Sequence, residues 1–89
     1  MLDDNTGMYY SKGKIISLTP TENLIMQVLI KNKDKIVTSK ELLYEVWLKE
    51  DNKANKRVLR TAIFRLKHKL QGYVKIMMIR NVGYVIREV

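Results

Sequence analysis

The sequence has no cysteine among its 89 residues, which excludes disulfide bonds and thiolate metal ligands. One proline and four glycines are too few for a collagen-like or linker-like chain. The apolar runs are only a few residues long, so no helix is expected to span a bilayer. The start, Met1-Leu2-Asp3-Asp4, lacks the basic flank and apolar stretch of a signal peptide. We therefore expect one small domain over residues 1–89, located in the cytoplasm.

Acidic residues are missing from one long stretch of the chain. Residues 52–87 contain ten Lys/Arg and no Asp/Glu, whereas residues 1–51 contain seven Lys/Arg and eight Asp/Glu. A lysine-rich genome is an alternative explanation, but it would also enrich lysine in the first half. The asymmetry favours a polyanionic partner for the second half.

The order of turn and capping signals predicts an α+β chain. Residues 1–7 are expected to be disordered, and residues 8–18 to form short strands around a turn near Gly13. Three helices are predicted within residues 19–72, and a hairpin within residues 73–89.

Two capping boxes predict the first two helices. Thr19 with Glu22, and Thr38 with Glu41, have the spacing of an N-cap residue and its partner three positions later. Pro20 suits the first helical position. The residues expected to be buried on these helices are Leu24, Ile25, Val28 and Leu29 on the first, and Leu42, Leu43, Val46 and Trp47 on the second.

The third helix, predicted over about residues 55–71, is amphipathic, and Gly72 is its expected C-cap. Its apolar positions follow helical spacing at Leu59, Ile63, Leu66 and Leu70. The nearly opposite face has Arg57, Thr61, Phe64 and His68, flanked by Arg60 and Arg65.

Two strands are predicted after this helix, Tyr73–Arg80 and Tyr84–Val89, with Asn81 and Gly83 in the turn. Asn and Gly tolerate positive φ, which is typical of a tight hairpin. Met77 and Met78 alternate along the first strand, so one of them should face the core.

The sequence lacks the residue patterns of a catalytic site. His68 is the only histidine, and the acidic residues are scattered outside the basic half. No Gly-rich phosphate loop follows a predicted strand. We therefore expect neither an enzyme nor a metal or cofactor site.

The exposed face of the third helix suits double-stranded DNA, because an α-helix fits the major groove. Arginine can donate two hydrogen bonds to guanine, and threonine or phenylalanine can contact the thymine methyl. Lys56, Lys67 and Lys69 lie around this face and would contact phosphates. Two alternatives stay open: Phe64 could instead pack under the hairpin or against a partner chain, and His68 could be an ordinary surface residue.

Four segments together resemble the winged-helix DNA-binding effector domain of OmpR/PhoB-type bacterial response regulators. They are Leu18-Thr19-Pro20-Thr21-Glu22, Ile36-Val37-Thr38 through Val46-Trp47, Arg57-Val58 through Leu70, and Gly83-Tyr84. The resemblance covers about residues 18–87.

The resemblance implies a winged helix-turn-helix: short N-terminal antiparallel strands, three helices, and a C-terminal hairpin wing. It implies that the third helix enters the major groove and the wing the adjacent minor groove. By position, it assigns Arg57 and Lys67 to the DNA backbone, Arg65 to bases, Arg80 to the minor groove, and Tyr84 to the wing. The DNA-binding residues expected in total are Arg57, Arg60, Thr61, Phe64, Arg65, Lys67, His68, Lys69, Arg80 and Tyr84.

The resemblance also has departures and implies further partners. The family usually has an acidic residue where Arg60 stands and often histidine where Ala62 stands, so the operator of a better-known member does not transfer. Loop 48–55 corresponds to a segment that contacts RNA polymerase in activators. If the chain is the output half of a longer regulator, a receiver domain and a sensor kinase are expected, with paired or tandem copies on DNA. The competing hypothesis is a winged helix that binds RNA polymerase or a partner regulator with little DNA specificity.

Overall fold

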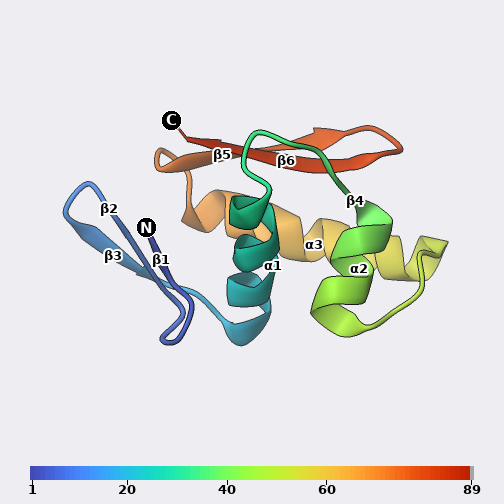
Figure 1. Cartoon of the computed structure of the whole chain (residues 1–89), viewed down its shortest axis with the longest axis horizontal. Helices are drawn as coiled ribbons and strands as arrows, with labels where there is room; N and C mark the ends of the chain where they lie inside the picture. The colour runs from blue at the N-terminus through green and yellow to red at the C-terminus, as the bar shows by residue number, and fades with distance from the viewer. Residues whose placement is uncertain (89) are drawn as a thin grey trace.

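A computed structural model describes residues 1–88 and contains three α-helices and two three-stranded antiparallel sheets (Figure 1). The N-terminal sheet lies beside the helices, and the C-terminal sheet extends along one side of the long third helix (Figure 1). The α+β winged-helix architecture predicted from the sequence is therefore confirmed.

The N-terminal sheet has the order β1-β2-β3. It consists of β1 (Leu2–Asp3), β2 (Met8–Ser11) and β3 (Lys14–Ser17). The predicted turn joins β2 to β3, where Lys12 and Gly13 have φ of 51° and 74°. A left-handed pair of this kind matches the twist of a two-residue hairpin.

The expected disorder of residues 1–7 is wrong. Leu2 pairs with Tyr9 across the sheet, and the Gly7 N–H donates to the Asp3 carbonyl at 2.8 Å. The Asp3 carboxylate also accepts from the Asn5 N–H at 3.1 Å, which closes the turn locally. Backbone pairing therefore orders a segment that has little apolar surface of its own.

Helix α1 (Pro20–Lys31) begins at the predicted capping box, in which Thr19 and Glu22 satisfy each other's backbone N–H groups. Its buried apolar residues are Ile25, Met26 and Leu29. Leu24 is 41% exposed, so its predicted burial is wrong. Met26 is buried instead, so the buried face of α1 is rotated slightly about the helix axis from the predicted one.

Helix α2 (Ser39–Trp47) also begins at its predicted box, with Thr38 as the N-cap and Glu41 as its partner. Leu42 and Leu43 are buried, whereas Val46 and Trp47 pack against the core while partly exposed. The short strand β4 (Val37–Thr38) precedes the helix and was not predicted.

Helix α3 (Lys53–Lys69) begins two residues before its predicted start, because the Asn52 side chain caps it by accepting from the Asn55 N–H at 2.8 Å. All four predicted apolar positions are buried: Leu59, Ile63, Leu66 and Leu70. Leu70 is the C-cap, and Gly72 (φ 89°) belongs to the turn that follows. The loop before α3 is therefore shorter than the predicted 48–55.

The C-terminal sheet has the order β4-β6-β5 and contains the predicted hairpin. Strands β5 (Val74–Ile79) and β6 (Gly83–Glu88) pair along their full length. Met77 is partly buried and Met78 is exposed, in line with the predicted alternation. Val89, the last residue of the predicted second strand, lies outside the described residues.

Of the two turn residues predicted to tolerate positive φ, only one adopts it. Asn81 has the expected positive φ of 63°, but Gly83 does not. A Cβ at Gly83 would overlap the Val37 carbonyl oxygen and lie 2.7 Å from the Thr38 Cα. Glycine is therefore needed there because β4 approaches β6 closely.

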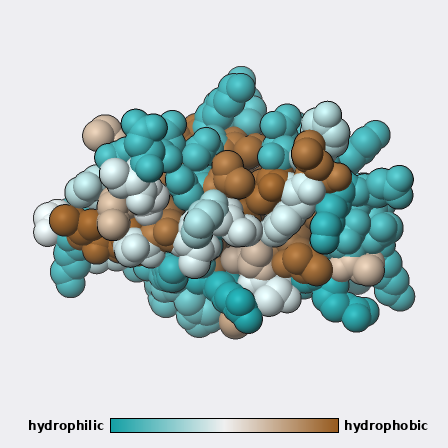
Figure 2. Space-filling model, turned by 90° about the horizontal axis from the view of Figure 1, so that it is seen from below, coloured by the Kyte–Doolittle hydropathy of each residue, from teal (hydrophilic) through white to brown (hydrophobic). Residues whose placement is uncertain are grey.

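The surface opposite the hairpin is mostly hydrophilic, with hydrophobic residues in separated groups (Figure 2). No helix within residues 1–88 is long and apolar enough to cross a bilayer.

Candidate nucleic-acid interface

The outer face of α3 exposes most of the side chains predicted to contact DNA. Its buried seam holds the helix against the core, so the opposite face points to solvent. The exposed candidates on this helix are Arg57, Arg60, Thr61, Phe64, Arg65, Lys67, His68 and Lys69. They occupy about three turns of one helix.

The charge of α3 is largely uncompensated by protein carboxylates. The helix contains seven Lys/Arg and no acidic residue. Within residues 1–88, the ion pairs involve Lys33, Lys56 and Lys69, so the guanidinium groups of α3 form none. Arginines without a carboxylate partner on one exposed face can bind the phosphates and base edges of a polyanion.

Phe64 is not in the core, because its side chain is 61% exposed. Its ring meets the His68 ring edge-on, with centroids 4.6 Å apart and planes at 72°. The alternative in which Phe64 packs under the hairpin is therefore not observed. Both rings stand on the basic face of α3.

The hairpin turn presents Arg80 to solvent beside Asn81 and Val82. The Val82 N–H donates to the Ile79 carbonyl at 2.9 Å, and the Ser39 N–H donates to the Val82 carbonyl at 3.1 Å. The second bond ties the turn to the start of α2. Arg80 thus extends from a fixed turn.

Tyr84, by contrast, is not placed to contact DNA directly. It is 5% exposed, between Val37 of β4 and Met78 of β5. Burial raises the pKa of its hydroxyl, and the charge and hydrogen bond of the Arg60 guanidinium act in the opposite direction. Tyr84 and Arg60 line the same cleft beside the wing turn.

Lys69 also departs from its expected phosphate contact. Its Nζ lies 2.6 Å from Glu22 Oε1 and 3.2 Å from the Ser17 carbonyl oxygen. Burial raises the pKa of Glu22, but the hydrogen bonds and charge of Lys69 and the Thr19 N–H outweigh it, and the pKa lies below its ordinary value. Lys69 therefore joins α3 to α1 and to the end of β3.

A cleft of about 370 Å³ separates the wing turn from the starts of α2 and α3. Lys40 and Arg60 line it from the two helices, and Asn81 lines it from the wing. Lys56, predicted to contact phosphate, also lines it and is paired there with Asp51 at 3.5 Å. Lys40 was not predicted to contact DNA. Its position just after the Thr38 N-cap was the available signal, because helix N-termini attract anions.

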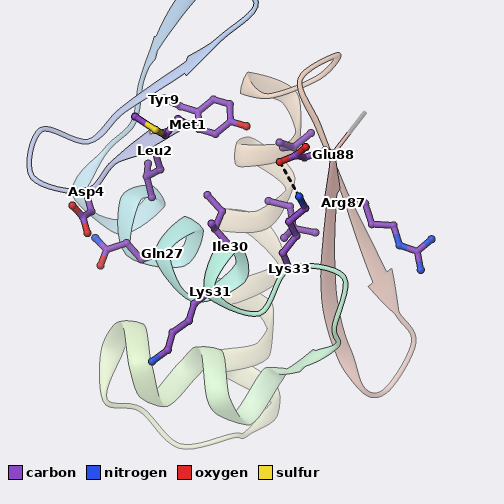
Figure 3. Close-up of a pocket in the computed structure, with 12 residues that line it drawn as sticks. Met1, Leu2, Asp4, Tyr9, Gln27, Ile30, Lys31, Lys33, Arg87 and Glu88 are labelled. Atoms are coloured by element: carbon purple, nitrogen blue, oxygen red, sulfur yellow. Dashed lines mark ion pairs between the residues drawn. The ribbon is translucent and has the colours of Figure 1, made fainter.

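Another cleft, of about 620 Å³, lies between the N-terminal sheet, α1 and the end of β6 (Figure 3). Tyr9 and Ile30 contribute apolar surface, and Lys33 pairs with Glu88 at 3.0 Å. Arg87 points away from it (Figure 3). None of the predicted DNA-contacting residues lines this cleft, so it is separate from the basic face.

Comparison with known protein families matches residues 13–86 to the family described as "Transcriptional regulatory protein, C terminal". The regulatory protein VanR of Enterococcus faecium is 30% identical over 92 residues, covering 99% of this chain and 40% of VanR. TctD of Salmonella typhimurium is 31% identical over 81 residues, covering 90% of this chain and 36% of TctD. The chain thus spans about two fifths of the length of these relatives.

Solved structures of similar fold also include domains of regulatory proteins. The C-terminal domain of the nisin resistance regulator NsrR is 30% identical, with a TM-score of 0.81 over 97% of this chain and 88% of that one. The DNA-binding domain of Bacillus subtilis CssR is 25% identical, with a TM-score of 0.81 over 97% of both chains. The DNA-binding domain of AdeR, solved with an intercistronic region, shares the fold at 24% identity and a TM-score of 0.81, over 100% of this chain and 94% of AdeR's.

Proposed function

The chain belongs to the family of transcriptional regulatory protein C-terminal domains, of the OmpR/PhoB type, and from this premise we propose that it binds double-stranded DNA sequence-specifically. In this proposal α3 enters the major groove, whose width accepts one α-helix. The β5–β6 hairpin is the wing and follows the adjacent minor groove.

The exposed, unpaired arginines of α3 carry this proposal. Arg57, Arg60 and Arg65 make no ion pair within the described residues, and α3 contains no acidic side chain. A guanidinium group can donate two parallel hydrogen bonds to guanine or to a phosphate. The same face of the helix thereby supports both attraction to DNA and recognition of bases.

The wing and its cleft support a second contact. Arg80 extends from the fixed turn and suits the negative potential of a narrow minor groove. Lys40 and Arg60 line the cleft between wing and helices, where they suit a phosphate of the strand that separates the two grooves. Lys56 also lines this cleft, but it is paired there with Asp51 at 3.5 Å. Arg80, Lys40 and Arg60 would fix the orientation of α3 on the duplex.

Selection of bound molecules from randomised duplexes, followed by affinity measurements at several salt concentrations, tests the proposal. Arg65→Ala should reduce affinity for the selected site more than for random DNA. Lys67→Met should reduce both about equally and lower the salt slope by roughly one unit, as expected for one lost phosphate contact. Equal losses on both DNAs for both variants would refute this division of roles.

Several partners belong to the same proposal. RNA polymerase would contact loop 48–52, where Leu48 is exposed and has a left-handed φ of 55°. Copies would assemble in pairs or in tandem on repeated half-sites, under the control of a receiver domain and a sensor kinase, in the cytoplasm. Strong binding to RNA polymerase or another regulator without salt-dependent DNA affinity would favour the protein-interaction alternative.

A further inference from the structure

An apolar stripe crosses the basic face of α3. Thr61 and Phe64 are exposed on adjacent turns, and the Phe64 side chain is 61% exposed. Arg57, Arg60 and Arg65 surround them on the same helix. A large apolar side chain exposed among cations suits a ligand that is anionic overall and apolar at one point.

Thr61 presents its methyl group rather than a hydroxyl donor. Its Oγ1 donates to the Arg57 carbonyl at 3.1 Å, one turn earlier in the helix. A threonine hydroxyl has only one hydrogen, so none is left to donate to a base. The oxygen can still accept a hydrogen bond, and the apolar group that Thr61 offers to a ligand is its methyl.

Phe64 is braced in position by its neighbours. The edge-on contact with His68, with centroids 4.6 Å apart, limits the freedom of the ring. A cleft of about 770 Å³ lies between this part of α3 and strand β5, where Ile76, Met77 and Met78 line it. The surroundings of Phe64 on the wing side are thus also largely apolar.

The positive charge of the outer face of α3 indicates which ligand supplies the apolar group. Its cations favour DNA over an apolar peptide, and the C5-methyl of thymine is the apolar group that bases display in the major groove. We propose that Thr61 and Phe64 form a subsite for thymine methyl groups. This inference rests on the proposed DNA binding and specifies which base feature α3 recognises.

Substitution in the DNA tests the subsite without altering the protein. Each thymine of a selected duplex is replaced singly by deoxyuracil, which removes only the C5-methyl. Burial of one methyl corresponds to about a fourfold change in Kd, so one or two positions should show an increase of about that size. 5-Bromodeoxyuridine at the same positions should restore the affinity, because bromine is close to methyl in size.

Protein variants assign the effect to the two side chains. Phe64→Ala and Thr61→Ser should each abolish the deoxyuracil effect at one of the sensitive thymines, and serine retains the hydroxyl that bonds to Arg57. Leu24→Ala changes an exposed apolar residue on α1 and should leave the effect intact. Circular dichroism verifies that each variant is folded.

The outcomes separate this inference from the proposed function. Specific binding with no thymine sensitive to deoxyuracil overturns the subsite alone. Sensitivity that persists unchanged in both Phe64→Ala and Thr61→Ser also overturns it. A protein that binds no duplex specifically overturns the proposed function together with the subsite.

Discussion

Replacing Lys67 or Lys69 of α3 by methionine should have opposite effects on stability and on DNA binding. Lys69→Met should destabilise the fold, because Nζ of Lys69 bonds to Glu22 and to the Ser17 carbonyl. Lys67→Met should leave stability unchanged and weaken DNA binding, because Lys67 is exposed and forms no ion pair within the described residues. Methionine keeps most of the length of both side chains.

The magnitude follows from the burial of the two partners. The Glu22 side chain is 8% exposed and the Lys69 side chain 38% exposed. Removing one partner of a fully buried pair costs about 3–5 kcal/mol. Because solvent reaches Lys69, that cost should fall to about 1–2 kcal/mol, or a decrease in Tm of roughly 4–16 °C for a domain of this size.

Thermal unfolding and DNA-binding measurements on both variants test this difference. Lys67→Met should change the free energy of unfolding by less than about 0.5 kcal/mol, as is usual for a surface substitution. Lys69→Met, measured well below its Tm, should keep the salt slope of DNA binding. An unchanged Tm in Lys69→Met, together with a salt slope lowered by about one unit, would refute the role inferred from the Glu22 contact.

Three further outcomes are expected. Gly83→Ala should destabilise the protein by about 2–3 kcal/mol in urea unfolding, because its Cβ would collide with the backbone of Val37; an unchanged midpoint would contradict that close approach. Arg60→Gln should raise the pKa of Tyr84, because the guanidinium lowers it; residue-resolved NMR titration of the tyrosine rings measures this pKa, and an unchanged value would show that Arg60 does not act on the phenol. The folded pKa of Glu22 lies below its ordinary 4.5, so its contribution to stability is complete above that value and is lost as the pH falls through the folded pKa. Glu22→Gln should remove this part of the acid dependence in unfolding curves measured against pH, whereas a profile identical to the parent's would exclude Glu22 as its source.

Elements specified by local chemistry were predictable from the sequence. The boxes at Thr19 and Thr38 require only residues three positions apart, and both form. The buried seam of α3 follows from helical spacing alone. Asn81 adopts positive φ because its own side chain permits it.

Features that depend on distant partners were not predictable. Strand β4 has two residues and exists because Val37 pairs with Tyr84, far along the chain. The role of Lys69 depends on Glu22, 47 positions earlier. Periodicity indicates which face of a helix is exposed, but not which of its charged groups finds a partner in the fold.

Strand β4 links the entry of α2 to the wing through backbone hydrogen bonds. Thr38 pairs with Gly83, and the Ser39 N–H donates to the Val82 carbonyl at 3.1 Å. The hairpin and the helix-turn-helix are consequently held at one spacing before any ligand arrives, so binding requires little further loss of conformational entropy. On DNA the helix-turn-helix and the wing would therefore fit duplexes whose adjacent grooves lie at this fixed distance. A duplex that must deform to reach that distance would bind more weakly.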